Sequence, residues 1–313
     1  MTRSSAPEPS RDNDTADEAA APHDTLPCVL SFNASDPTGA GGVVSDAMVI
    51  ASIGAHALPV ITGADVRDTR EIMGHASLGD DAVAEQAGAV AEDIPLHAIK
   101  IGFAGSAEAV AAIAAFVSDY PAVPVVAYMP DLSWWSEDEI DNYLDAFREL
   151  LLPQVAVLVG NNTTLRHWLL PESTTDRRAR ATDLARAAGE LGVSYVLVTG
   201  IPAVGDQLGN VLASAQGELF SQSYERIDAG FLGAGDILSA ALTALIATGS
   251  ELTEAVAEAL QYLDQALDHG FRPGMGRAVA DRLFWAESDD ADSADDDAPP
   301  SFEIPHPFNE TKH

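Results

Sequence analysis

Short apolar runs that alternate with helical patterns constrain the fold of this chain more than any other feature. The runs are rich in β-branched residues and nearly continuous in apolar residues, which is typical of strands covered on both faces. They are Cys28–Phe32, Ala57–Thr62, Ala98–Phe103, Val123–Tyr128, Val155–Val159 and Tyr195–Thr199. The segments between them predict helices at 42–53, 79–92, 106–118, 136–151 and 175–191. This alternation predicts an α/β fold with a mainly parallel central sheet and helices on both faces.

The remaining segments extend this prediction. After Gly200, the segments Asn210–Ala215 and Glu218–Ile227 indicate a hairpin of edge strands, and two long helices are expected at about 235–248 and 252–268. We expect three parts in all. They are a disordered acidic N-terminal tail (residues 1–26), a folded domain (residues 27–286) and an acidic low-complexity C-terminal tail (residues 287–313).

The charge of the chain limits its partners. Its 313 residues carry a net charge of −33, and the central domain alone has 34 acidic residues against 13 Lys and Arg. Nucleic acids and anionic membranes are bound through basic patches, so neither is an expected partner. Cys28 is the only cysteine, and no apolar run approaches the length of a membrane span. Together these features favour a cytoplasmic protein.

The most informative short motif is Gly233-Ala234-Gly235-Asp236, at the start of an apolar helix. A turn of small residues there directs backbone N–H groups and the positive end of the helix dipole at one point, which suits a phosphate oxygen. Asp236 adds a carboxylate base within reach of that point, and phosphoryl transfer to a hydroxyl requires both an anion site and a base. An ordinary helix boundary, with an Asp placed for the dipole, explains the tetrapeptide equally well.

Other polar residues follow the predicted strands, where parallel sheets bind their ligands. The glycine-rich segment 36–42, which is followed by Asp46, fits neither a dinucleotide fingerprint nor a Walker-type loop. We interpret Asp65, Arg67 and Asp68 as an exposed salt bridge in a loop. Lys100 lies inside an apolar run, so its ammonium must find a partner or reach solvent.

Two further features have a structural and a functional interpretation. Asn161 follows the fifth predicted strand, where its amide could contact a nucleotide phosphate or cap the next helix. Trp134 and Trp135 could cover a ligand, but we interpret them as local packing. The eight His residues show no metal-ligand spacing, so no metal ligand is assigned.

Over almost all of residues 27–286 the chain resembles the hydroxymethylpyrimidine/phosphomethylpyrimidine kinases of the ribokinase-like superfamily. The segments that carry the resemblance are SDPTGAGGVVSDAMVIASIGAHALPVITGADVRDT, AIKIGFAGS, LLPQVAVLVGNN, VLVTG and GAGDILSAALTAL. The resemblance implies a ribokinase-like three-layer sandwich with ATP and Mg²⁺ as cofactors. It also implies ATP-dependent phosphorylation of 4-amino-5-hydroxymethyl-2-methylpyrimidine, or of its monophosphate, in thiamine biosynthesis.

The resemblance also implies roles for particular residues. Asp236 matches the catalytic position, which is usually Cys in this family, and the anion hole matches Gly233, Ala234 and Gly235. The implied substrate-binding residues are Asp46, Arg67, Ala34 and Gly41. The implied ATP-binding residues are Asn161, Thr199, Gly200 and Lys100. The oligomeric state is not fixed by the sequence, and a homodimer is kept as the candidate assembly.

Three departures from the family pattern keep alternatives open. Arg67 replaces a Gln that helps to hold the pyrimidine, and a guanidinium donates hydrogen bonds but cannot accept them. Two acids that the family has near the phosphates are Thr164 and Tyr128 here, with Asp131 three residues after Tyr128. One alternative is a protein with the kinase fold that binds a pyrimidine or has a regulatory role, and that phosphorylates its ligand little or not at all. The other is a kinase for another small alcohol, such as pyridoxal or a sugar.

Overall fold

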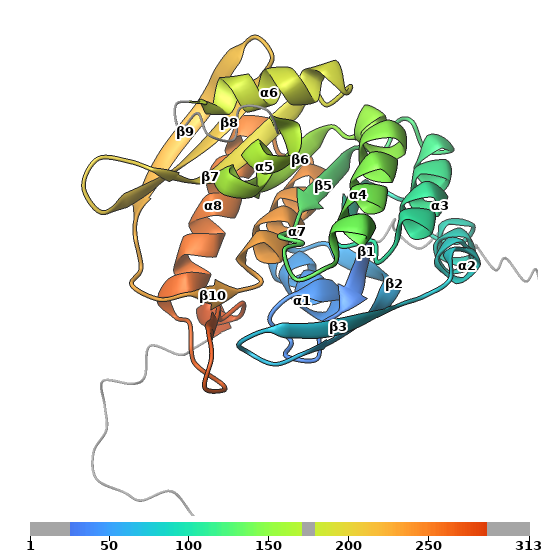
Figure 1. The fold of residues 1–313 in the computed structure, drawn as a ribbon, viewed down its shortest axis with the longest axis horizontal. Coiled ribbons are helices and arrows are strands. Elements are labelled where there is room, and N and C mark those ends of the chain that lie inside the picture. The colour runs from blue at the N-terminus through green and yellow to red at the C-terminus, as the bar shows by residue number, and fades with distance from the viewer. Residues whose placement is uncertain (1–25, 171–178, 287–313) are drawn as a thin grey trace, which may run out of the picture.

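A computed structural model describes residues 26–170 and 179–286 of the chain. The predicted tails lie outside the described residues, apart from Leu26, and so do residues 175–178 of the predicted helix 175–191. Within the described part, a large sheet runs through the middle of the molecule and helices cover both of its faces (Figure 1).

The sheet has nine strands among the described residues, in the order β3-β2-β1-β4-β5-β6-β7-β8-β9. Six neighbouring strands pair in parallel, in the order β2, β1, β4, β5, β6 and β7. At the two edges of the sheet, β3, β8 and β9 are antiparallel to their neighbours. The strands are β1 (Cys28–Ser35), β2 (His56–Arg67), β3 (Ile72–Ser77), β4 (Ala98–Ile101), β5 (Val125–Met129), β6 (Val157–Asn161), β7 (Tyr195–Pro202), β8 (Gln207–Ser214) and β9 (Gly217–Glu225).

The helices form two layers, one on each face of the sheet. One layer holds α1 (Gly42–Ile53), α7 (Ala234–Ala247) and α8 (Leu252–Asp268). The other holds α2 (Asp80–Ala91), α3 (Ala107–Ser118), α4 (Glu137–Ala146), α5 (Asn162–Leu169) and α6 (Ala181–Glu190). The structure therefore confirms the predicted α/β class, with a mainly parallel sheet between two helical layers.

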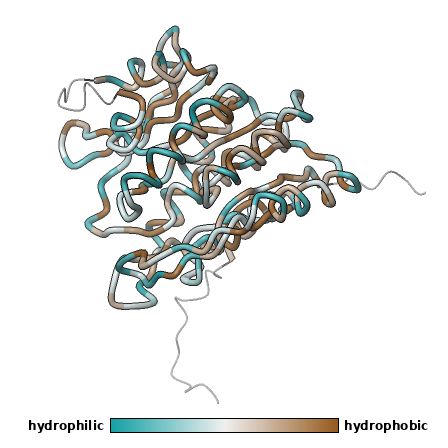
Figure 2. The backbone as a smooth tube through the Cα atoms, turned by 45° about the vertical axis from the view of Figure 1, so that its right-hand side comes forward, coloured by the Kyte–Doolittle hydropathy of each residue, from teal (hydrophilic) through white to brown (hydrophobic). Residues whose placement is uncertain are grey.

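The strands from the inner part of the sheet divide their side chains between two hydrophobic cores. In β1, Val29 packs into the core below α1, α7 and α8, while Leu30 and Phe32 pack into the core below α2 to α6. Successive side chains of a strand point to opposite faces, so a strand buried on both faces must be apolar at nearly every position. Figure 2 shows hydrophobic stretches in the strands and in the helices that flank them.

Several predicted boundaries need correction. The strand predicted at Ala57–Thr62 continues to Arg67, because its second half pairs with β3, a short edge strand that the sequence did not reveal. Asp65 and Arg67 therefore lie within β2 and not in a loop. The predicted helix 136–151 is α-helical only to Ala146 and continues as a π-helical turn, Phe147–Leu151. The sequence analysis does not predict helix α5, and Asn161, for which a cap was one of two interpretations, is its N-cap.

A two-stranded parallel sheet joins the end of the domain to the start of α7. It pairs β10 (Phe231–Leu232) with β11 (Ala278–Val279). Leu232 and Val279 form a small buried cluster with Ala40 from the turn before α1. This cluster brings the turn before α1 and the turn before α7 together, although almost two hundred residues separate them in sequence.

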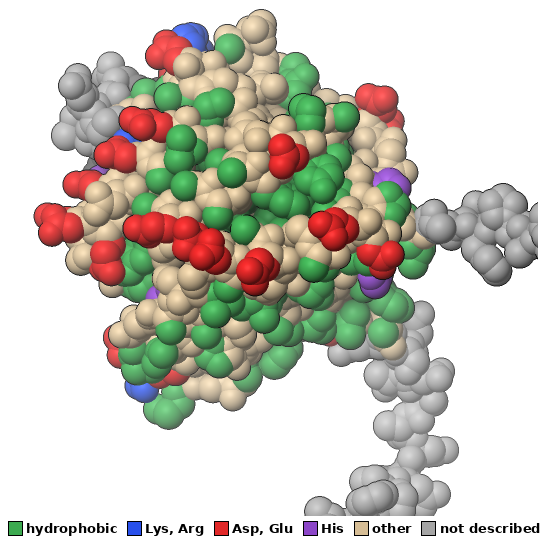
Figure 3. Space-filling view, turned by 90° about the vertical axis from the view of Figure 1, so that its right-hand side faces the viewer, with side chains coloured by type: hydrophobic (Ala, Val, Ile, Leu, Met, Phe, Trp, Pro, Cys, Tyr) green, Lys and Arg blue, Asp and Glu red, His purple; other side chains and the backbone are tan. Residues whose placement is uncertain are grey.

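The described residues contain no helix that is both long and apolar enough to cross a bilayer. On the face drawn in Figure 3, Asp and Glu side chains are spread over the surface and few Lys or Arg side chains lie among them.

We expect Phe32→Ala to lower the free energy of unfolding by about 3–5 kcal/mol, because it leaves a cavity in the core. Phe32 is fully buried in β1, with its ring edge against Phe116 at 5.8 Å between centroids. Urea unfolding followed by circular dichroism measures the change. The control is Leu219→Ala in β9, whose side chain is 47% exposed, and it should cost less than about 1 kcal/mol. Equal losses in the two variants would contradict the described core.

Candidate active site

A cavity of about 650 Å³ opens at the edge of the sheet where the central parallel strands end. Its walls come from β1, β2, β5, β6, β7 and the turn before α7. Binding beyond the carboxyl ends of parallel strands is the usual arrangement in open α/β sheets. The residues that line the cavity include Asn33, Ala34, Asp36, Gly41, Gly42, Asp65, Arg67, Glu71, Phe103, Tyr128, Asp131, Trp134, Asn161, Thr199, Gly233, Ala234, Gly235 and Asp236.

The turn between β1 and α1 is organised by Asp36. One of its oxygens accepts hydrogen bonds from the backbone N–H and the hydroxyl of Thr38, at 2.8 and 2.7 Å, and the other accepts from the N–H of Gly41 at 3.1 Å. Gly41 has no room for a side chain, because a Cβ there would lie 2.7 Å from an oxygen of Asp236. The glycines of the segment 36–42 thus allow the turn to approach the start of α7 closely.

The turn before α7 forms an anion site. Gly233, the N-cap of the helix, has the left-handed φ of 73°, and a side chain there would collide with the backbone of Ala40. Ala234, Gly235 and Asp236 form the first turn, whose N–H groups have no partner within a helix. All four residues line the cavity. These N–H groups and the helix dipole therefore favour an anion at this point.

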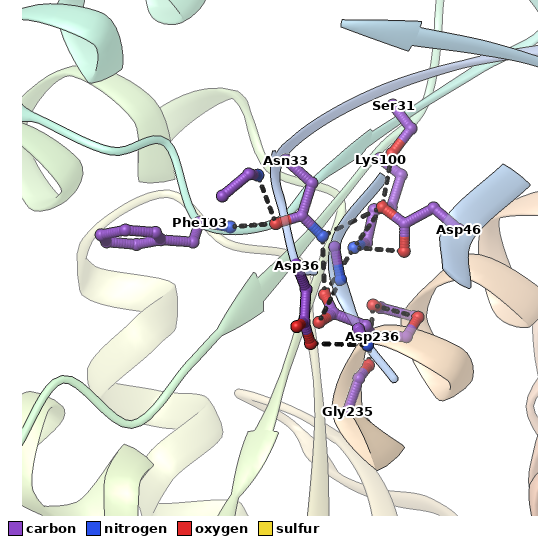
Figure 4. A network of polar contacts seen from close by, with 12 residues as sticks. Ser31, Asn33, Asp36, Asp46, Lys100, Phe103, Gly235 and Asp236 are labelled. Atoms are coloured by element: carbon purple, nitrogen blue, oxygen red, sulfur yellow. Dashed lines mark hydrogen bonds and ion pairs between the residues drawn. The ribbon is translucent and has the colours of Figure 1, made fainter. Parts of the chain in front are cut away.

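The carboxylate of Asp236 is held by a buried ion-pair network (Figure 4). The ammonium of Lys100 lies 2.8 Å from Asp236 Oδ1 and 2.8 Å from each carboxylate oxygen of Asp46. Lys100 and Asp46 are fully buried, and the side chain of Asp236 is 16% exposed. The second oxygen of Asp236 accepts the N–H of Gly42 at 3.2 Å. Of the three charged residues in this network, Asp236 is the one that lines the cavity.

Asn33 links this network to the sheet. Its side-chain amide donates to Asp46 at 3.0 Å and to Asp236 at 2.8 Å. Its side-chain oxygen accepts the backbone N–H groups of Ala34 and Phe103, at 2.9 and 3.1 Å. These four hydrogen bonds satisfy the whole amide group, so Asn33 has one defined orientation.

The two carboxylates share one ammonium, and their pKa values move apart. Burial raises the pKa of Asp46 to about 6, with the charge of Asp236 adding to that effect and Lys100 opposing it. Burial also acts to raise the pKa of Asp236, but the Lys100 ammonium and the hydrogen bonds from Lys100, Asn33 and Gly42 outweigh it and lower this pKa. Asp236 is therefore ionised at neutral pH. The pKa of Lys100 is raised, because its two carboxylates outweigh the effect of burial.

A second group of residues lies at the ends of β6 and β7. Asn161 caps α5 by accepting the N–H of Thr163 at 2.8 Å, and its amide nitrogen packs beside Gly200. Thr199 donates to the carbonyl of Gly160 at 3.4 Å. Asn161 and Thr199 line the cavity on the side away from β2, while Gly200 does not line it.

The sequence-predicted site residues separate into two sets. The cavity is lined by Asp236, Gly233, Ala234, Gly235, Arg67, Ala34, Gly41, Asn161 and Thr199. Asp46, Lys100 and Gly200 do not line it. The geometry gives no support to the prediction that Lys100 binds ATP, since its ammonium is buried between two carboxylates. Nor do Arg67 and Asp68 form an exposed salt bridge, since Arg67 lies 3.6 Å from Asp36 and Asp68 pairs with Arg70.

Sequence reasoning missed Asn33 as a site residue. The one feature of the sequence that pointed to Asn33 is its position directly after the first predicted strand, in an otherwise apolar segment. Trp134 and Trp135 do pack locally as predicted, with ring centroids 5.4 Å apart, and Trp134 also lines the cavity.

Tyr128, at the end of β5, lies against the anion site. A side chain at Gly235 would collide with the Tyr128 ring and hydroxyl, so the two residues are in close contact. Burial raises the pKa of Tyr128, and the charges of Asp236 and Asp131 add to the effect. The phenol thus stays neutral and can donate a hydrogen bond towards the cavity.

The described residues hold no group of three or more His, Cys, Asp or Glu side chains that could bind a metal ion. Asp131 does line the cavity, three residues beyond Tyr128, and one of its oxygens accepts the N–H of Ser133 at 2.9 Å.

Solved structures share this fold. An ADP complex of pyridoxal kinase from Bacillus subtilis matches with a TM-score of 0.74 and 21% identity, over 83% of this chain and 99% of that one. Phosphomethylpyrimidine kinase from Clostridium difficile 630 matches with a TM-score of 0.62 and 23% identity, over 76% of this chain and all of that one. The chain thus has the ribokinase-like fold of small-molecule kinases.

Sequence comparison narrows this class. A family model described as phosphomethylpyrimidine kinase matches residues 36–281, so the chain belongs to the phosphomethylpyrimidine kinase family. A hydroxymethylpyrimidine/phosphomethylpyrimidine kinase from Streptomyces coelicolor is 28% identical over 271 residues, which cover 86% of this chain and 98% of that protein. The resemblance noted in the sequence is therefore confirmed.

We expect Lys100→Met to lower the free energy of unfolding at pH 7 by about 3–5 kcal/mol, because it leaves two buried carboxylates without a cation. It should also raise the pKa of Asp236. Since that pKa is depressed in the folded protein, ionised Asp236 stabilises the wild type above pH 3.8, and this contribution is lost as the pH falls through the folded pKa. Denaturant unfolding across a pH series measures both effects.

The matched control for Lys100→Met is Arg186→Met. Arg186 pairs with Asp183 at 3.3 Å, but its side chain is 59% exposed. Breaking this exposed pair should cost less than about 1 kcal/mol. If the two variants lost equal stability, the network around Lys100 would not have the energetic role described here.

Proposed function

We propose that this protein transfers the γ-phosphoryl group of ATP to the hydroxymethyl group of 4-amino-5-hydroxymethyl-2-methylpyrimidine, or to the phosphate of its monophosphate, in thiamine biosynthesis. One observation carries the proposal. An ionised carboxylate, Asp236, and a helix N-terminus with free N–H groups meet at one point of a cavity in a member of the phosphomethylpyrimidine kinase family.

In this mechanism Asp236 acts as the base. The hydroxyl oxygen of the substrate attacks the γ-phosphorus, a new O–P bond forms and the bond to the β-phosphate oxygen breaks, so that ADP leaves. The hydroxyl proton passes to the Asp236 carboxylate. The N–H groups of Gly233–Asp236 stabilise the charge on the transferring group. Tyr128, in contact with Gly235, is placed to donate a further hydrogen bond to it.

Lys100 serves this mechanism as a positioning residue. It keeps Asp236 ionised and fixes one of its oxygens, while Asn33 fixes the same oxygen from a second direction. Asp46 acts through Lys100, because both of its oxygens contact the Lys100 ammonium inside the protein. We therefore assign Asp46 to the support of the base, and the direct contact with the pyrimidine to residues that line the cavity.

The nucleotide is proposed to lie against the ends of β6 and β7. Asn161 has a side-chain amide to donate to a phosphate, and Thr199 has a hydroxyl at the same wall of the cavity. The left-handed φ of 68° at Gly200 lets the chain turn beside Asn161 without a side chain in the way. The solved relatives with this fold include complexes with ADP and with AMP-PCP.

Mg²⁺ is proposed to enter with the nucleotide. Mg²⁺ in kinases is commonly held by the phosphates, by water and by one or two carboxylates, so it does not need a site built from protein alone. Asp131 fits the role of such a carboxylate, because it lines the cavity beside Tyr128. When bound, the ion would neutralise phosphate charge.

A kinase for pyridoxal is the second candidate, because pyridoxal kinases are among the structures that share this fold. Their identity to this chain is 20–21% and shows the fold alone. A pyrimidine-binding protein with little turnover is the third candidate, and the replaced acids at Thr164 and Tyr128 are its basis. We propose that the kinase is cytoplasmic, which a localisation experiment can test. We also propose that it forms a homodimer, which sedimentation can test.

We expect Asp236→Asn to lower kcat with the pyrimidine by about 10²–10⁴-fold, since it removes the general base. Coupled assay of ADP release measures this, with the pyrimidine and pyridoxal as alternative substrates. Asp206→Asn is the control, because Asp206 is an exposed acid in the turn between β7 and β8. Undiminished turnover by Asp236→Asn would overturn the mechanism. A wild type that phosphorylates pyridoxal but not the pyrimidine would overturn the substrate.

A further inference from the structure

Two charged side chains on β2 line the cavity on the side away from β6 and β7, where the nucleotide is proposed to lie. Asp65 and Arg67 are two residues apart, and successive side chains of a strand alternate between its faces. Both line the cavity, while Ala64 and Val66 beside them are exposed. The side chains of Asp65 and Arg67 are only 12% and 13% exposed. The strand therefore presents a largely buried hydrogen-bond acceptor and a largely buried donor on the same face.

The carboxylate of Asp65 is oriented by His75. The two residues are directly opposite in the antiparallel pair of β2 and β3, and His75 Nδ1 lies 2.8 Å from Asp65 Oδ1. The imidazole makes this hydrogen bond in the tautomer that carries its proton on Nδ1, with the carboxylate oxygen as the acceptor. Among the described residues, Oδ2 of Asp65 has no hydrogen-bond partner, although the carboxylate lines the cavity.

The His75 ring has little freedom to move away. Its side chain is 2% exposed and its ring stands edge-on to Phe103, at 4.9 Å between centroids. Gly63 and Gly105 both lie close to its Nε2, so that a Cβ on either would meet the ring. The packing thus fixes the imidazole, and the imidazole fixes Asp65.

Arg67 is placed by a different partner. One of its terminal nitrogens lies 3.6 Å from Asp36, the residue that organises the turn between β1 and α1. A guanidinium has five N–H donors, so this contact leaves others free for a ligand. Phe103 and Trp134, which line the same cavity, provide aromatic surface for a flat ring.

We propose that Asp65 and Arg67 together recognise the amino group and the neighbouring ring nitrogen of an aminopyrimidine, with His75 as the residue that positions Asp65. The amino group of such a ring donates and the adjacent nitrogen accepts, which matches a carboxylate next to a guanidinium. A guanidinium cannot accept a hydrogen bond, and Asp65, two residues before Arg67, supplies the acceptor.

This assignment rests on the proposed function and makes it more specific. A ligand without the amino group leaves the Asp65 carboxylate buried against the ring without a donor, which costs binding. A ligand with a negatively charged oxygen at the same position is repelled by Asp65. The site therefore favours an aminopyrimidine over a hydroxypyridine of similar size.

The experiment compares Asp65→Val with the wild type on two ligands. They are 4-amino-5-hydroxymethyl-2-methylpyrimidine and its analogue without the amino group. Binding by calorimetry and the KM and kcat of phosphorylation are measured for each ligand. We expect the wild type to bind the amino compound about 10–100-fold more tightly than the analogue, as for a hydrogen bond to a charged group. Asp65→Val should lose this preference through KM, with kcat changed much less.

Two further variants separate recognition from folding. His75→Phe should reduce the same preference, because Asp65 is no longer oriented. Glu71→Val is the matched control, since Glu71 is another carboxylate that lines the cavity, and it should keep the preference. Retained ADP binding shows that each variant is folded.

The possible outcomes separate the two proposals. A wild type that binds the two compounds equally, or an Asp65→Val variant that weakens both by the same factor, overturns the role of Asp65 and leaves the kinase function intact. A wild type that binds and phosphorylates neither compound overturns the proposed substrate and this assignment together.

Discussion

The structure around the active site depends on one buried ammonium. Lys100 stands in β4, a buried inner strand of the sheet, and its charge is balanced by Asp46 of α1 and Asp236 of α7. An isolated charge in such a place would be prohibitive, so the three residues are stable only together. Two carboxylates around one cation leave a net negative charge. That charge is carried at the cavity by Asp236, the least buried member.

Because these partners come from different elements, the network fixes the geometry of the site. Asn33 connects the end of β1 to both carboxylates, and Gly42 connects the start of α1 to Asp236. The N–H groups of the α7 turn and the carboxylate that follows them thus have set positions before any ligand arrives. Prearranged dipoles of this kind stabilise a transition state without a cost of reorganisation.

The sequence predicted more of the fold than of the candidate site. Apolar strands such as Cys28–Phe32 and the glycine turn before Asp236 are local signals, and both were found where predicted. The pairing of Lys100 with Asp46 and Asp236 is not local, since it joins residues 54 and 136 positions apart. For the same reason Asp65 was misread, because the strand that holds His75 opposite it has only six residues and little apolar pattern.

The place of α7 in the chain has a consequence for biosynthesis. This helix packs against β1, β4, β5 and β6, so it covers the centre of one face of the sheet, yet it begins only at residue 234. Asn33 and its hydrogen-bond partner Asp236 are 203 residues apart in the sequence. During translation, Lys100 and Asp46 are made long before the second carboxylate, and that face of the sheet stays open to water. Loop closure over such a distance is slow. The nascent protein therefore has the cavity residues of β1 and β2 well before Asp236, and the cavity is complete only after the last fifth of the domain has been made.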